Sequence, residues 1–261
     1  MSSQNNNSPV SNLLLKTVVD ISKIVLSGDS HESLLGHPVS KKILIKNQIL
    51  QLIQTLYYQA LRERHFKIIH KSCINTDALF SLPRNKTIFL FFHQPFVRYL
   101  PVWFSEKGFT LHVLGNRKRI KPLPYFISVL ESESRYHRYH YNPVITLKIL
   151  LDLLNKGEIV LLAADGRLGK HFMKVKFGER TLQTPRGIYM LAQAAGAFIV
   201  PVFMRLKRII PSPKFELLIG DRYQFKGSPE EEIEKIESIF SWYYFNVIEQ
   251  PHMWMRIAPG K

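Results

Sequence analysis

Residues 86–92 read KTIFLFF, an apolar run with the length of a strand, and His93 follows it directly. Short runs rich in branched and aromatic residues are typical of strands buried on both faces. Similar runs recur at residues 110–114, 158–164, 198–204 and 215–220. Helical patterns lie between most of them, over about 95–105, 143–156 and 184–196, and a last one covers about 229–247. This alternation predicts an α/β fold with a mixed, largely parallel sheet flanked by helices.

The segment before the first strand is expected to be helical. Residues 11–27 carry Leu14, Val18, Ile21 and Val25 at helical spacing, so that one apolar face could pack on the domain or lie on a membrane. Ser40 is a suitable cap for a second helix that runs to about residue 64. We therefore expect a helical N-terminal extension over residues 1–85, packed on an α/β core over residues 86–261 and continuous with it.

The charge of the chain is strongly positive. Its 36 Lys and Arg against 20 Asp and Glu leave a formal charge of +16. Such a surplus requires an anionic partner, which can be nucleic acid, a layer of lipid headgroups or an acidic carrier protein, and charge alone does not choose among them. No nucleic-acid reader motif accompanies the basic residues, so we expect no nucleic-acid partner.

The expected location is the cytoplasm. A single cysteine, Cys73, cannot form a disulfide within the chain and fits a reducing compartment. The first ten residues lack the pattern of a secretory signal peptide. The most apolar long window, residues 87–104, is interrupted by His93, Arg98 and two prolines, so we expect peripheral contact with a membrane rather than a spanning helix.

The common catalytic motifs are missing from the sequence. No Walker loop, dinucleotide-binding glycine fingerprint, HExxH helix or GxSxG elbow occurs. His137 and His140, in the run RYHRYH, could share a helix face and bind a metal, but neither an acid nor a cysteine lies nearby in the sequence. A basic surface is the commoner explanation, and we expect neither a metal nor a resident cofactor.

Two blocks at predicted strand ends are candidates for a site. His93 follows the strand at 86–92 and should lie at the carboxyl edge of the sheet, where open α/β sheets bind ligands. There it could act as a general base, or it could simply be satisfied by hydrogen bonds within a loop. Asp165 ends the strand at 158–164 and begins a basic loop over residues 164–187, which could hold phosphate or be a solvated basic face. The cations of that loop include Arg167, Lys170 and Arg186.

These residues resemble a known family. The blocks FLFFHQP, LLAADGRLGKHFMKVKFGERTLQTPRGIYMLAQAAGAFIVPVFMR and IEQPHMWMRI resemble the lipid A biosynthesis lauroyl/myristoyl acyltransferases, within the lysophospholipid acyltransferase superfamily. The resemblance extends over about residues 86–257. It implies a glycerolipid acyltransferase-like fold and a membrane-associated enzyme of lipid biosynthesis. Such an enzyme transfers a fatty acyl group from an acyl carrier protein or coenzyme A thioester to an acceptor hydroxyl.

One position departs from the family pattern. The resemblance implies that His93 is catalytic and that an acidic residue follows it after four residues, but Arg98 occupies that position. A nearby cation cannot orient the imidazole as a carboxylate would and would lower its pKa. One explanation is that Asp165 supplies the carboxylate from the other strand end. Alternatively, Arg98 binds a phosphate or carboxylate of an unusual substrate while His93 acts alone, which an amine or an already acidic nucleophile would tolerate. A third explanation is that the chain is a non-catalytic lipid- or carrier-binding protein.

The expected function is therefore acyl transfer, with the thioester as co-substrate and no other cofactor. His93 and Asp165 are the expected catalytic residues. Arg98, Arg167, Lys170 and Arg186 are the expected groups for the anionic parts of the substrates. The basic run at residues 116–121 could dock an acidic carrier protein or be a solvated loop. The expected location is the inner face of the cytoplasmic membrane, with peripheral attachment.

Overall fold

The computed structural model describes a set of separate ranges that together form the α/β core. These are Ile45, Ile49, 73–74, 86–92, Val97, 100–115, 131–140, Asn142, 145–166, 171–208 and 214–248. Within them, no helix has both the length and the apolar character needed to cross a membrane.

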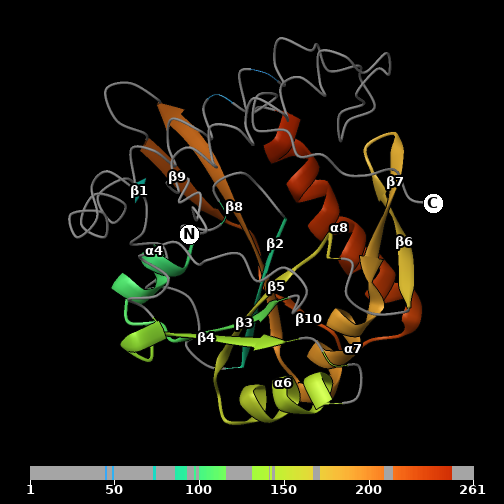
Figure 1. Cartoon of the computed structure of the whole chain (residues 1–261). Coiled ribbons are helices and arrows are strands. Elements are labelled where there is room, and N and C mark those ends of the chain that lie inside the picture. The colour runs from blue at the N-terminus through green and yellow to red at the C-terminus, as the bar shows by residue number, and fades with distance from the viewer. Residues whose placement is uncertain are drawn as a thin grey trace, which may run out of the picture.

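The described strands form one large sheet and a separate two-stranded sheet (Figure 1). The strands of the large sheet are β1 (Cys73–Ile74), β2 (Thr87–Phe91), β3 (Leu111–Gly115), β4 (Tyr136–His140), β5 (Ile159–Ala163), β8 (Phe198–Arg208), β9 (Lys214–Ile219) and β10 (Tyr223–Gln224). A separate hairpin is formed by β6 (Phe172–Phe177) and β7 (Arg180–Pro185). The helices are α4 (Leu100–Glu106), α6 (Ile145–Asn155), α7 (Arg186–Ala195) and α8 (Pro229–Ile248).

The strand order is β1-β9-β8-β2-β5-β3-β4, with β10 paired to β8. The pairs from β8 through β2, β5 and β3 to β4 are all parallel. Strands β9 and β10 run antiparallel to β8, and β1 runs parallel to β9. The prediction of a mixed, largely parallel sheet is confirmed.

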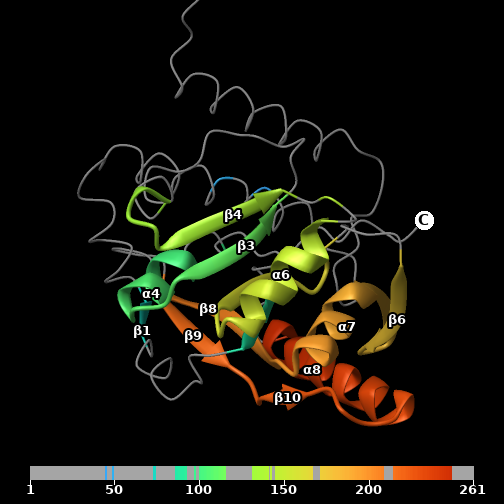
Figure 2. The ribbon, with the colours of Figure 1, turned by 90° about the horizontal axis from the view of Figure 1, so that it is seen from below.

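Helices cover both faces of this sheet, α4 on one side and α6, α7 and α8 on the other (Figure 2). Alternate residues of β2 supply the two cores, as expected for a strand buried on both faces. Phe89 packs toward α4, where its ring meets Phe104 edge to face with centroids 4.6 Å apart. Ile88 and Leu90 pack toward the three other helices.

The five strands predicted from the sequence are confirmed, and so are the helices over α6, α7 and α8. The helix expected from about residue 95 is seen from Leu100. The expectation of a loop over residues 164–187 is wrong for most of its length, because lysines alternate with buried residues there and form the β6–β7 hairpin. The helix expected over 11–27 lies outside the described residues, and the one over 40–64 is described only at Ile45 and Ile49, both helical.

Candidate functional site

The candidate site lies at the carboxyl ends of β2 and β5. These strands are parallel neighbours, and Phe91 at the end of β2 is in register with Ala163 at the end of β5. Beyond these ends the chain leads from β2 to α4 on one face and from β5, through the hairpin, to α7 on the other. Open α/β sheets bind ligands where adjacent strands send their connections to opposite faces. By this general rule, this pair of strand ends is the candidate ligand-binding position of the fold.

Asp165 lies at this position, two residues beyond β5 and partly exposed. The pairing with β2 continues one step past the strand, because the Ala164 amide donates to the Phe91 carbonyl at 2.7 Å. The Gly166 amide then donates to the Ala163 carbonyl at 3.2 Å, which closes a tight turn. A Cβ on Gly166 would lie only 3.0 Å from that carbonyl oxygen, so a glycine suits the turn. These bonds fix the backbone on both sides of Asp165.

Tyr243 of α8 contacts β2 and β8 close to these strand ends. Its hydroxyl donates to the Leu90 carbonyl of β2 and accepts from the Val202 amide of β8 at 3.2 Å. Leu90 and Pro201 form the last register pair between those strands. After this pair β2 stays with β5, while β8 continues along β9. The Tyr243 hydroxyl thus joins β2 and β8 at the point where they separate.

The electrostatics link Tyr243 to Asp165. Burial raises the pKa of Tyr243 well above its usual value of 10.0, and the negative charge of Asp165 raises it further. The phenol is therefore protonated throughout the neutral range and can donate to Leu90.

The structure describes two of the predicted site residues, Asp165 and Arg186, and they belong to different elements. Asp165 is at the end of a sheet strand, whereas Arg186 is exposed in the first turn of α7, with its amide bonded to the His171 carbonyl at 3.1 Å. The predicted residues His93, Arg98, Arg167 and Lys170 lie outside the described residues, as does the run at 116–121.

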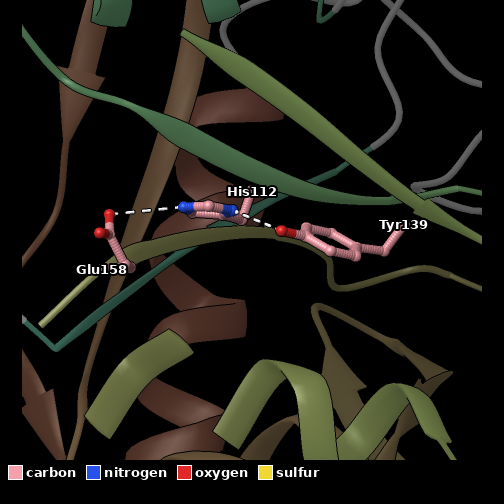
Figure 3. Close-up of polar contacts among 3 residues, drawn as sticks. All are labelled: His112, Tyr139 and Glu158. Atoms are coloured by element: carbon pink, nitrogen blue, oxygen red, sulfur yellow. Dashed lines mark hydrogen bonds and ion pairs between the residues drawn. The ribbon is translucent and has the colours of Figure 1, made fainter. Parts of the chain in front are cut away.

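A second polar cluster lies on the face of the sheet that α6 covers (Figure 3). The His112 ring is between Tyr139 and Glu158, with Nδ1 3.1 Å from the Tyr139 hydroxyl and Nε2 3.4 Å from a Glu158 carboxylate oxygen. The His137 ring stacks on it with centroids 4.9 Å apart. Burial lowers the pKa of His112, and Glu158 opposes this shift. A neutral ring protonated on Nε2 donates to Glu158 and accepts from Tyr139, so the cluster ties β3, β4 and the start of β5 together.

The interpretation of His137 and His140 as neighbours on a helix face is wrong. Both belong to β4, and positions three apart on a strand fall on opposite faces. His137 instead pairs in register with His112 of β3. Across the described ranges, no group of three or more His, Cys, Asp or Glu side chains is arranged to hold a metal ion.

Sequence reasoning missed Tyr243, which looks like an ordinary core aromatic in the run SWYYF. The sequence feature that could have indicated this position is Pro201. A proline cannot donate to the ladder and rarely occurs in a central strand unless the pairing changes there. Comparison of the chain with models of protein families and with curated proteins found no match.

Proposed function

We propose that this chain is an acyltransferase that moves a fatty acyl group from a thioester to a hydroxyl or amine acceptor, a lipid or lipid-like metabolite. The proposal includes the glycerolipid acyltransferase-like fold, the helical N-terminal extension and peripheral attachment to the inner face of the cytoplasmic membrane. No metal or resident cofactor takes part in it.

The observation that carries the proposal is the register of β2 and β5. Phe91 pairs with Ala163, and the chain reaches His93 and Asp165 two residues after these paired positions. Parallel strands in register deliver equivalent positions to the same edge of a sheet. The register thus supports a dyad in which Asp165 replaces the acid missing at Arg98.

In this dyad His93 takes the proton of the acceptor hydroxyl or amine as its oxygen or nitrogen attacks the thioester carbonyl. Asp165 orients the imidazole and stabilises its protonated form. The tetrahedral intermediate collapses with cleavage of the carbon–sulfur bond, and the thiolate leaves with the proton that His93 holds. The products are an ester or amide and a free thiol, and backbone donors stabilise the oxyanion between the two steps.

The donor is an acyl carrier protein or coenzyme A thioester, and both carry phosphate. Guanidinium and ammonium groups suit such anions. Arg98, Arg167, Lys170 and Arg186 are the proposed anion-binding residues, and Arg186 is exposed beside the hairpin base, where a phosphate can approach it.

The test is acyl transfer by the purified full-length chain. Acyl carrier protein and coenzyme A donors are supplied in turn with a lipid and small-molecule extract, and products are identified by mass spectrometry. We expect a product whose mass increases by the acyl group and which disappears with His93→Ala. If the His93→Ala variant formed the same product, His93 would not be the base. Tight binding of the donor without turnover would instead identify a lipid- or carrier-binding protein. The presence of Arg98 in place of an acid favours that function.

A further inference from the structure

We infer that one surface, formed by the starts of α6 and α7 and the outer side of β6, docks on an anionic lipid bilayer. This apolar-basic face consists of Leu147, Lys148, Phe172, Lys174, Arg186 and Met190. This assignment goes beyond the proposed function, because it names the surface that makes the peripheral membrane contact. It rests on the proposed function only for the reason why the protein would bind a membrane.

The apolar members of the face are exposed although they are large. Leu147 is 48% exposed, Met190 57% and Phe172 37%. Large apolar side chains scattered singly over a surface need no explanation, but neighbouring ones mark sites of interaction. Each of these three comes from a different element, so no single amphipathic pattern accounts for them.

The contacts make these residues neighbours. Leu147 packs beside α7 at Gly187, where an added Cβ would lie 4.0 Å from its Cδ2 atom. Met190 is one helical turn beyond Gly187. Phe172 pairs with Pro185, the residue before α7, and so lies next to that helix start. Figure 2 shows α6, α7 and β6 side by side in the same order.

Basic side chains are interleaved with the apolar ones. Lys148, Lys174 and Arg186 are all exposed. No acidic residue occurs in α7 or in the first turn of α6. Exposed apolar side chains among lysines and arginines are typical of surfaces that enter the interface of a bilayer with anionic headgroups. An acidic protein would match the charge alone, and the three apolar side chains would then have no role.

The position of the face suits delivery of a lipid to the candidate site. Helix α6 leads into the start of β5, and α7 leads into the start of β8, so both helices begin toward the carboxyl edge of the sheet. Asp165 lies at that edge. A bilayer bound to the apolar-basic face would therefore be beside the strand ends, where a hydrocarbon chain or lipid headgroup can reach the site without crossing the domain.

The acidic surface of α8 provides a matched control. Ile233 is 48% exposed, as Leu147 is, but it lies among Glu230, Glu234 and Glu237. Lys226 is an exposed lysine close to the start of the same helix. A double variant Ile233→Ser/Lys226→Gln makes the same kind of changes outside the six residues of the face, among the acidic residues of α8.

The test is co-sedimentation of the full-length protein with vesicles of phosphatidylcholine alone or with phosphatidylglycerol. We expect binding to the anionic vesicles to fall roughly tenfold with Lys148→Gln/Lys174→Gln and roughly tenfold with Phe172→Ser/Met190→Ser. The control variant Ile233→Ser/Lys226→Gln should bind like the unmodified chain. Far-UV circular dichroism confirms that each variant is folded.

Two outcomes would overturn the inference. Binding that the lysine variant weakens and the apolar variant leaves unchanged would indicate an electrostatic surface for an acidic protein. Equal binding by all variants would place membrane contact elsewhere. Because sedimentation needs no turnover, a chain that binds vesicles through this face and transfers no acyl group would refute the proposed function and leave this inference intact.

Discussion

The hydroxyl of Tyr243 donates a hydrogen bond to the carbonyl of Leu90, 153 residues earlier in the chain. It also accepts from the Val202 amide, so one buried side chain connects α8, β2 and β8 at the point where the two strands separate. The Phe92 ring packs edge to face on the same tyrosine, with centroids 4.4 Å apart. The residue immediately before His93 is thus held by the C-terminal helix.

Tyr243→Phe should destabilise the fold by about 1–3 kcal/mol, because it removes the partner of a buried carbonyl and a buried amide while it keeps the ring. Urea denaturation measures the change. Tyr244→Phe, on the same helix and partly exposed, is the control and should change stability by less than about 0.5 kcal/mol. Equal effects of the two substitutions would show that the Tyr243 hydroxyl has no special role.

Asp165→Asn should lower kcat strongly and leave the affinity for the acyl donor nearly unchanged, since an amide fills the same space but cannot stabilise a protonated imidazole. A loss of about 10²-fold or more would fit an orienting carboxylate. The measurement is kcat and KM with the donor that the unmodified chain accepts. Asp152→Asn, on the exposed side of α6, controls for the lost charge. A change in stability with normal turnover would make Asp165 a structural residue.

The His112 cluster should make stability depend on pH. Burial lowers the pKa of His112 below its usual value of 6.5, so the unfolded chain binds a proton at a higher pH than the folded chain does. Stability is therefore retained above about pH 6.5 and is lost as the pH falls through 6.5 toward the lowered pKa. His112→Gln keeps a donor and an acceptor but does not titrate, and it should flatten this part of the profile.

Urea denaturation between about pH 5 and pH 7.5 checks the His112 prediction. The groups that act on His112 are Glu158, His137 and Tyr139, so their substitutions would change the same profile. His171→Gln, at an exposed position, should leave the slope as it is. A His112→Gln variant with the slope of the unmodified chain would disprove the assignment.

Gly178→Ala should weaken the attachment of the hairpin to α8. Gly178 has a φ of +61°, and an added Cβ would overlap the ring of Tyr244. Gly196, at the end of α7, has nearly the same φ of +62° but open space around it. Gly196→Ala should therefore cost only the backbone strain, about 1 kcal/mol. Gly178→Ala should cost about 1–3 kcal/mol more, because the ring must move.

Urea denaturation of the two glycine variants separates these contributions, and limited proteolysis shows whether the hairpin becomes accessible. Similar stabilities for Gly178→Ala and Gly196→Ala would mean that the hairpin tip moves away from Tyr244 at no cost.

The sequence predicted the central strands because burial on both faces leaves a simple pattern. Strands β2 and β5 and the first seven residues of β8 are nearly continuous apolar runs, as expected for strands buried on both faces. It failed for β4 and the β6–β7 hairpin, which are partly exposed and carry histidines, arginines and lysines. Short exposed strands have a weak pattern, since solvent tolerates many side chains on one face.

The candidate site was predicted only in part for a related reason. A polar residue directly after a buried strand must lie at the edge of the sheet, so Asp165 was recognisable from the sequence. Its neighbours were not, because they depend on which strands are adjacent and on which face each connection takes. Tyr243 belongs to α8, far along the chain from β2 and β5. A helical pattern indicates only that such a residue is buried, not what it contacts.

The sequence by itself determined the five buried strands and the helices between them, the excess of positive charge and the strand end that carries Asp165. These are local properties, because the apolar pattern, the charge and the periodicity of a segment depend only on the residues of that segment. Only the tertiary structure decided that β5 lies beside β2, that their connections leave on opposite faces and that Tyr243 reaches Leu90. Those relationships join residues far apart in the chain. They depend on the order of the strands in the sheet and on the packing of the helices on its two faces.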